Sequence, residues 1–254
     1  MTRVVLTQPA PRVSAVALAL RARHHEVVEL PFARLVSLLD QPAVAQRLAA
    51  LDSYDCAVLV SPGAVEIVCA ALPAGWPANV ALAVVGPGSL AALREHGIDD
   101  ARYRIHRPAL PPFDSQALLR EPPFDAPSGL RIVVLRGAQG RTDWIDTLRQ
   151  RGAQVDAVPV YRSEPVAPLP DAADRIAGWA DQRRPVAWIF TSVDAVQRCA
   201  DWLSQTGRAD VIGRQSAFAL HPRIVQALGQ HGWRQPRLIE PGEAALAAAL
   251  EFVT

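Results

Sequence analysis

The sequence contains no lysine, because every one of its 26 basic residues is arginine. Without lysine, Schiff-base chemistry, a pyridoxal-phosphate anchor and the lysine of a P-loop are excluded. Arginine suits planar, bidentate binding of carboxylates. The absence of lysine therefore excludes several classes of enzyme, whereas a ligand that carries carboxylates is compatible with the arginines.

Cysteine and histidine are also scarce, with three and six residues. Cys56, Cys69 and Cys199 are odd in number and share no metal-ligand spacing, and the first two lie in apolar patterns typical of a core. The histidines form no ligand cluster, and two of them precede glycines where helices are expected to end. We therefore predict that the protein binds no metal.

Strong charge and long hydrophobic runs are absent as well. The net charge is +1, with no basic run that would indicate a nucleic-acid partner. The apolar stretch 15–20 is bounded by arginines and predicts a buried helix face, and no run is long enough to span a bilayer. With no signal-peptide pattern, we expect a cytoplasmic protein without membrane contact, and a monomer.

The sequence does contain an internal duplication, in which strand-to-helix turns recur in the same order roughly 130 residues apart. The matching segments begin at Arg3 and Arg131, at Val27 and Val155, at Tyr54 and Val186, and at Ala83 and Ala219. A duplication of this length predicts two similar domains.

Short β-branched runs alternate with amphipathic stretches, which predicts parallel sheets in an α/β fold. The expected strands lie near 3–7, 27–31, 56–60, 81–85, 102–105, 131–135, 155–161, 186–190 and 216–220. Each repeat carries about five strands, the size of a flavodoxin-like sheet. The domain boundary is either the proline-rich stretch 108–127 or a pair of extended segments beginning at Leu30 and Val158, and the pattern favours neither.

Small polar residues follow most of the expected strands, where ligands of α/β sheets bind. They are Thr7 and Gln8, Ser61 and Gly63, Gly86 and Ser89, Arg136 and Gly137, Thr191 and Ser192, and His221 to Arg223. Taken singly, each Ser or Thr is explained as a helix N-cap and each Gly as a turn residue. Taken together on both copies, they favour a site for a polyanion.

Two common site motifs are missing. No G-x-G-x-x-G fingerprint with a following acid is present, which disfavours nicotinamide and flavin cofactors. No G-x-S-x-G turn is present, so hydrolase chemistry lacks a nucleophile.

Tyr161 ends one of the extended segments, beside Arg162. A phenol can donate or accept a proton without a permanent charge, which suits activation of a leaving hydroxyl. An aromatic ring packed at a domain junction would explain the same position.

In order along the chain, the motifs resemble the uroporphyrinogen-III synthase family over nearly the whole length. The pieces begin at Leu59 (LVSPGAV), Val84 (VVGPGSLAAL), Phe113 (FDSQALL), Val134 (VLRGAQGR), Gly152 (GAQV), Pro159 (PVYR), Phe190 (FTS) and His221 (HPRI). The resemblance implies two flavodoxin-like lobes joined by two antiparallel linker strands, near 27–34 and 157–164. Lobe one would hold residues 1–34 and 163–254, and lobe two residues 35–162.

The resemblance also implies a reaction, the cofactor-free cyclisation of hydroxymethylbilane with loss of water. Ring D is inverted through a spiro intermediate, whereas the bilane closes uninverted without the enzyme. The protein would hold one folded conformation of the bilane and assist departure of the hydroxide. Whether it also contacts hydroxymethylbilane synthase transiently is left open.

The resemblance assigns roles to individual residues. Tyr161 matches the family's linker tyrosine, the candidate that assists loss of the hydroxyl. The matched substrate-binding positions are Ser61, Ser89, Arg136, Gly137, Arg141, Thr191 and Ser192. Gln8 and Gly63 stand where Arg and Asn are common in the family, and Gln116 where Glu is common. Arg223 as a carboxylate clamp, and Thr7 and Gln8 as rim residues, are inferences from position.

Two other functions remain open. A two-lobed cytoplasmic domain that binds a polycarboxylate without catalysis would show closure on its ligand and no turnover. A sugar-phosphate or nucleotide enzyme on the same scaffold would need a phosphate loop, which the sequence lacks.

Overall fold

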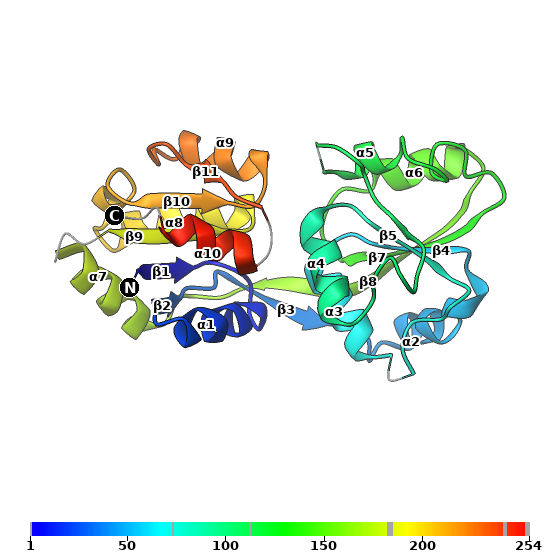
Figure 1. Ribbon diagram of the computed structural model, residues 1–254, viewed down its shortest axis with the longest axis horizontal. Coiled ribbons are helices and arrows are strands. Elements are labelled where there is room, and N and C mark those ends of the chain that lie inside the picture. The colour runs from blue at the N-terminus through cyan, green and yellow to red at the C-terminus, as the bar shows by residue number, and fades with distance from the viewer. Residues whose placement is uncertain (1, 73, 112, 182–184, 241–242, 252–254) are drawn as a thin grey trace. The chain divides into compact units, whose positions relative to one another are not determined.

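The computed structural model describes residues 2–72, 74–111, 113–181, 185–240 and 243–251. The chain forms two compact units, here named unit 1 and unit 2 (Figure 1). Unit 1 comprises Met1–Leu35 and Glu164–Thr254, and unit 2 comprises Val36–Ser163. The chain therefore passes between the units twice, and unit 1 is discontinuous in sequence.

Unit 1 is built on a parallel sheet with the strand order β11-β10-β9-β1-β2. Its strands are β1 (Arg3–Leu6), β2 (Glu26–Glu29), β9 (Val186–Phe190), β10 (Ser216–Ala219) and β11 (Arg237–Leu238). Successive side chains of a strand point to opposite faces, so Val4 and Leu6 enter one core cluster and Val5 enters another. Both faces are buried, which explains why β1 is continuously apolar after its arginine.

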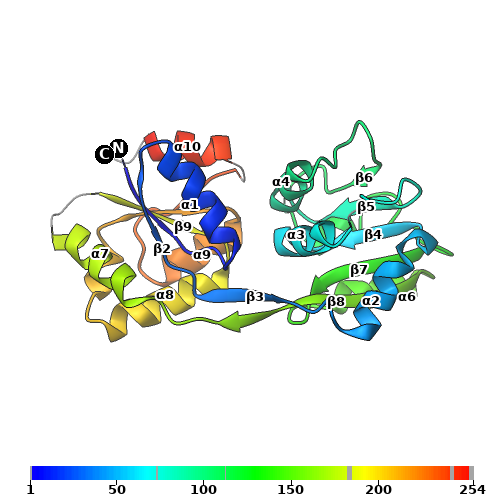
Figure 2. The same cartoon turned by 90° about the horizontal axis from the view of Figure 1, so that it is seen from below.

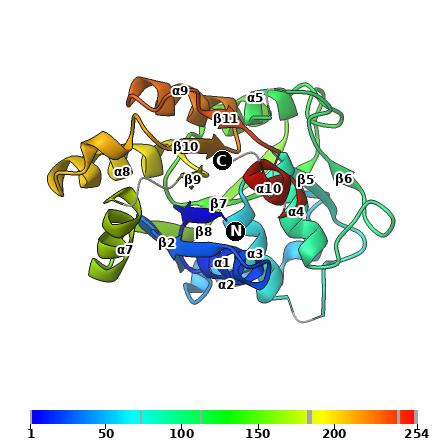
Figure 3. The same cartoon turned by 60° about the vertical axis from the view of Figure 1, so that its left-hand side comes forward.

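Helices cover both faces of this sheet (Figure 2). The helices are α1 (Arg12–Ala22), α7 (Pro170–Asp181), α8 (Val193–Gln205), α9 (Pro222–Gln230) and α10 (Glu243–Glu251), with a 3₁₀ turn, η2 (Ala209–Val211). α1 and α10 pack against the face that carries Val4, while α7, α8 and α9 pack against the face that carries Val5. α7 lies beside β2, and α8 lies beside α9 (Figure 3).

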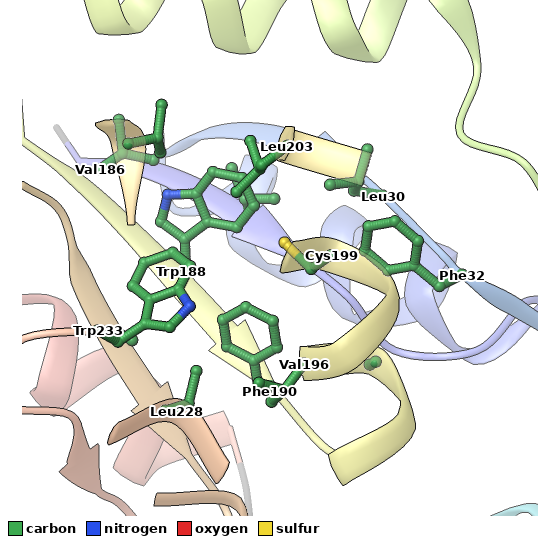
Figure 4. Packing of buried hydrophobic residues seen from close by; sticks show 14 of the residues in the cluster. Leu30, Phe32, Val186, Trp188, Phe190, Val196, Cys199, Leu203, Leu228 and Trp233 are labelled. Atoms are coloured by element: carbon green, nitrogen blue, oxygen red, sulfur yellow. The ribbon is translucent and has the colours of Figure 1, made fainter. Parts of the chain in front are cut away.

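The core on the α8 side of unit 1 is aromatic (Figure 4). The ring centroid of Trp188 lies 5.4 Å from that of Trp233 and 6.3 Å from that of Phe190. Cys199 and Leu203 of α8 are fully buried in the same cluster. Cys199 therefore acts as an apolar core residue.

Burial also governs the chemistry of the cysteine thiols. It raises the pKa of Cys56 to about 12 and that of Cys69 to about 11, and it raises the pKa of Cys199. The neighbouring charge of Asp55 adds to the effect of burial on the pKa of Cys56. All three thiols therefore keep their protons at neutral pH.

The raised pKa of Cys56 predicts a loss of stability at alkaline pH. An unfolded thiol ionises near pH 8.5, so between about pH 9 and 12 the unfolded state binds fewer protons than the folded state. The free energy of unfolding should then fall by about 1.4 kcal/mol per pH unit for this group. Urea unfolding from pH 7 to 10.5 should show a shallower alkaline slope for Cys56→Ala than for the unmodified chain. Equal slopes would contradict the prediction, and neither protein should show this slope near pH 7.

Unit 2 is built on a second sheet with the order β3-β8-β7-β4-β5-β6. Its strands are β3 (Ala33–Ser37), β4 (Cys56–Leu59), β5 (Ala81–Val84), β6 (Ile105–His106), β7 (Arg131–Gly137) and β8 (Gln154–Pro165). Its helices are α2 (Pro42–Ala49), α3 (Pro62–Ala70), α4 (Pro87–Glu95), α5 (Ser115–Leu118) and α6 (Asp143–Gln150), with a 3₁₀ turn, η1 (Leu51–Ser53). α2, α3 and α4 share one core cluster, and α5 and α6 share the cluster on the other face of the sheet (Figure 1).

The two sheets have the same strand order once the duplication is considered. Unit 1 reads β2-β1-β9-β10-β11, and unit 2 reads β8-β7-β4-β5-β6 once its edge strand β3, which lies beside β8, is set aside. Both are the 2-1-3-4-5 order of flavodoxin-like sheets, with β7 and β8 in the places of β1 and β2. Each unit therefore combines two strands of one repeat with three strands of the other, and the predicted fold class is confirmed.

β3 and β8 carry the chain between the units as antiparallel strands. The Leu38 amide donates to the Val160 carbonyl at 2.9 Å, and the Val166 amide donates to the Phe32 carbonyl at 3.1 Å. Residue numbers thus fall along one strand as they rise along the other, which is the antiparallel pattern. The proline-rich stretch 108–127 lies within unit 2.

The strand prediction was wrong at the edges of the sheets. β6 is two residues long where a strand was expected at 102–105, β11 was not expected, and β3 covers Ala33–Ser37 where a linker strand was expected near 27–34. Edge strands pair on one side and are short. Both residues of β11 are exposed, so the sequence there has no buried apolar position to indicate a strand.

Candidate active site

Tyr161 lies on β8 in unit 2, half-buried, with its hydroxyl oxygen 3.0 Å from Ser61 Oγ. Ser61 follows β4 and is the N-cap of α3, where its Oγ accepts a hydrogen bond from the Ala64 amide at 3.1 Å. The cap fixes the Ser61 side chain, because it satisfies one of the free amides of the first helical turn. Residues 100 positions apart in sequence thereby form one hydroxyl pair.

Gly137, at the end of β7, lies directly against the Tyr161 ring. A Cβ atom at position 137 would lie 2.9 Å from Tyr161 Cε2 and Cζ and 3.0 Å from the hydroxyl oxygen. These separations are shorter than packed carbon atoms adopt. The position of the phenol therefore depends on the absence of a side chain at residue 137.

The loop that follows Gly137 is hydrogen-bonded to the same strand. The Ala138 amide donates to the Tyr161 carbonyl at 2.7 Å, and the Ser163 amide donates to Gln139 Oε1 at 3.2 Å. Arg136 is 9% exposed, and its Nη2 donates to the Gly140 carbonyl at 2.8 Å. The guanidinium of Arg136 thus closes the loop onto the end of β7.

Arg141 is exposed and forms a bidentate pair with Asp143 in the first turn of α6, with distances of 2.8 and 3.2 Å. The hydrogen bond from Arg141 lowers the pKa of the Asp143 carboxyl. Gln116 Nε2 also donates to Asp143 Oδ2, at 3.3 Å, the oxygen that accepts from Arg141 Nη2. The exposed guanidinium of Arg141 is therefore already paired with one carboxylate, that of Asp143.

Two further predicted positions lie in the first turns of helices in unit 2. Gly63 is buried in α3, and Ser89 is 3% exposed in α4. These helices follow β4 and β5, whose carboxyl ends lie at the same sheet edge as the end of β7 because the strands are parallel. Both residues are therefore placed at the edge that carries Ser61 and Gly137.

In unit 1, Thr7 and Gln8 follow β1 but are buried. The Thr7 hydroxyl donates to the Ile189 carbonyl at 2.8 Å, so it supports the pairing of β1 with β9. Gln8 is 6% exposed, and its Oε1 has no hydrogen-bond partner among the described residues. Neither side chain is presented at the surface of unit 1.

The other predicted residues of unit 1 lie at the starts of two helices. Ser192 is the N-cap of α8 and accepts from the Ala195 amide at 3.1 Å, with Thr191 half-buried beside it. His221 caps α9, because its Nδ1 accepts from the Arg223 amide at 3.1 Å. The Arg223 side chain is exposed. The N-cap explanation holds for Ser61, Ser192 and His221 alike.

Within the ranges that the structure describes, no three histidine, cysteine, aspartate or glutamate side chains form a group that could hold a metal ion. In the same ranges, none of the helices has the length and apolar character needed to cross a membrane.

Known proteins resemble this chain along its whole length. A model of the uroporphyrinogen-III synthase HemD family matches residues 14–245. The chain belongs to this family. The uroporphyrinogen-III synthase of Salmonella typhimurium is 27% identical over 98% of this chain and 99% of its own, and that of Escherichia coli is 24% identical over 98% and 99%.

Solved structures of the family share the fold. A mutant uroporphyrinogen III synthase from Thermus thermophilus matches 98% of this chain and 97% of its own with a TM-score of 0.55 and 16% identity. The synthetase from Helicobacter pylori matches 99% of both chains with a TM-score of 0.51 and 14% identity. Family membership confirms the resemblance seen in the sequence, and with it uroporphyrinogen-III synthase activity, that of a hydro-lyase in tetrapyrrole biosynthesis.

For a uroporphyrinogen-III synthase, the notable group is the one that the structure brings together from three strands of unit 2. Ser61 and Gly137 each lie against Tyr161, and Arg136 closes the adjoining loop. Among the described residues, no hydrogen bond joins Ser89 or Arg141 to Tyr161, and the Arg141 guanidinium binds Asp143 instead. Sequence reasoning missed Gln139, although it lies inside the segment that carries the resemblance at Arg136 to Arg141.

Proposed function

We propose that the chain converts hydroxymethylbilane to uroporphyrinogen III and that Tyr161 assists departure of the terminal hydroxyl. The contact between the hydroxyls of Tyr161 and Ser61 carries the proposal. Ser61 Oγ already accepts the Ala64 amide proton, so its own proton can be donated to the phenol oxygen. The Tyr161 proton is then directed to a third oxygen, that of the substrate.

The proton balance of the reaction suits a single phenol. The C–O bond of the hydroxymethyl group breaks with its electrons on oxygen, and a proton from Tyr161 completes the water molecule. The pyrrole nitrogen of ring A stabilises the resulting cation, which the substituted carbon of ring D attacks to form the spiro intermediate. Fragmentation and reclosure invert ring D, and the final loss of one proton from carbon returns a proton to the phenolate. The net change is the loss of one water, and no cofactor takes part.

The acetate and propionate groups of the bilane would bind at the strand ends of both units. The proposed contacts are Ser61, Gly63, Ser89, Arg136, Gly137, Arg141, Thr191, Ser192 and Arg223, with Thr7 and Gln8 as supporting residues of the site. Among these, Arg141 and Arg223 carry exposed guanidinium groups. A substrate carboxylate that binds Arg141 would share its guanidinium with Asp143. Thr7 and Gln8 are buried, so they would support neighbouring residues of the site.

The remaining expectations concern partners and location. Hydroxymethylbilane is the proposed substrate, with no nucleic acid and no membrane involved. A monomer, a cytoplasmic location and a transient contact with hydroxymethylbilane synthase stay predictions.

Separation of uroporphyrinogen isomers tests the function directly. Purified protein supplied with freshly made hydroxymethylbilane should yield predominantly the type III isomer, while the enzyme-free control yields type I. The isomer ratio reports inversion of ring D, which binding alone does not produce. Type I as the only product would favour the polycarboxylate-binding domain without catalysis.

A further inference from the structure

The pairing of β7 with β8 becomes irregular where the two strands approach Tyr161. Arg136 is registered with Pro159, but Gly137 is registered with Tyr161, so β8 contributes one extra residue between them. Such a bulge redirects a side chain and interrupts the ladder of hydrogen bonds. Pro159 also lacks an amide proton to donate. The regular pairing of β7 with β8 is therefore interrupted just before Tyr161.

Beyond this point, the loop after β7 forms the hydrogen bonds that hold β8, in place of the regular ladder between the two strands. The Ala138 amide binds the Tyr161 carbonyl at 2.7 Å, and the Gln139 side chain accepts the Ser163 amide at 3.2 Å. β8 is thus held at the residue that carries the phenol and again two residues later. The first bond needs only backbone, whereas the second depends on the amide side chain of Gln139.

The loop is itself held in shape by its flanking residues. Gly140 has a φ of +118°, a backbone angle that residues other than glycine rarely adopt. Its carbonyl receives the Arg136 guanidinium at 2.8 Å, a charge-assisted bond made by a buried cation. The two loop residues that bind β8 lie between these two fixed points.

We propose that Arg136, Ala138 and Gln139 form a clasp that positions Tyr161 for the reaction. The proposal rests on the proposed role of Tyr161 in releasing the hydroxyl. Gln139 is a positioning residue, because it acts through β8 and does not touch the phenol. Arg136 holds the clasp closed, which is a second role beside the carboxylate binding proposed for it.

The clasp predicts a specific effect of Gln139→Ala. Loss of the bond to Ser163 lets the end of β8 shift, and small misplacements of a catalytic group are costly. We expect kcat to fall about tenfold with KM unchanged. Gln139→Glu should restore most of the activity, since its carboxylate can accept the same amide proton. Gln150→Ala, an exposed glutamine at the end of α6, is the matched control and should keep full activity.

¹⁹F NMR tests whether the Tyr161 ring changes its surroundings, without a measurement of activity. The chain has three tyrosines, so protein labelled with 3-fluorotyrosine should give three ¹⁹F resonances, and Tyr161→Phe identifies that of Tyr161. Gln139→Ala should shift or broaden this resonance and leave those of Tyr54 and Tyr103 in place. An unchanged Tyr161 resonance, or a change in all three, would overturn the clasp. Full activity of Tyr161→Phe would instead overturn the role of Tyr161, whatever the ¹⁹F spectrum shows.

Discussion

Tyr161→Phe lowers turnover by about 10²-fold or more and leaves the fold intact; this is the largest effect that we expect from a single atom. A positioned proton donor contributes roughly 10² to 10⁴ in rate. The substitution removes the hydroxyl that faces Ser61 and keeps the ring that packs against Gly137. Isomer analysis after long incubation should then show a product mixture shifted towards type I, since slow catalysis competes with spontaneous closure.

The cost to stability should be small, because the variant loses one hydrogen bond, worth about 1 kcal/mol. Thermal unfolding followed by circular dichroism checks this part of the expectation. Tyr103→Phe is the matched control, because Tyr103 is half-buried in unit 2 and packs against the same core cluster as Tyr161. Near-normal turnover of Tyr161→Phe would remove Tyr161 from the mechanism and leave only its role in packing.

The fold was predictable from the sequence to the extent that it depends on repetition and periodicity. The duplication required two similar sheets, and the continuous apolar runs at β1, β4 and β9 indicated strands buried on both faces. The exchange of strands between units was not visible in the pattern, because either boundary gives the same local periodicity. Only the resemblance to the family indicated this exchange. In the structure, the antiparallel strands β3 and β8 carry the chain from one unit to the other.

The candidate site was predictable only in part. Parallel strands place Ser61 and Gly137 at the same sheet edge, which the strand ends indicated. Their contact with Tyr161 depends on the bulge in β8, and a one-residue change of register leaves no signal in composition or spacing. For Thr7, the strand-end pattern predicted a side chain that binds substrate, but this side chain is buried. Its hydroxyl is bound to the Ile189 carbonyl of the neighbouring strand.

Gly137→Ala should lower kcat by about 10²-fold while keeping the Tyr161 hydroxyl in the chain. The added Cβ would lie 2.9 Å from the ring, so the phenol must move by several tenths of an ångström or more. A half-buried ring can rotate away from the methyl group, which moves its hydroxyl away from Ser61. Misplacement of about 1 Å at a reacting group is enough for a loss of this size. Overpacking costs about 1–3 kcal/mol, and the yielding ring should keep the change in unfolding free energy near the lower end.

The matched control is Gly178→Ala in α7, where no atom lies within 4 Å of an added Cβ. This variant should keep full turnover and gain about 0.5–1 kcal/mol of stability, because alanine favours a helix over glycine. The double variant Gly137→Ala with Tyr161→Phe separates the possible causes. If the methyl group acts by displacing the phenol, the double variant should be no slower than Tyr161→Phe alone. Multiplication of the two losses would mean that Gly137 contacts the substrate itself, which would assign it to binding and not to the placement of Tyr161.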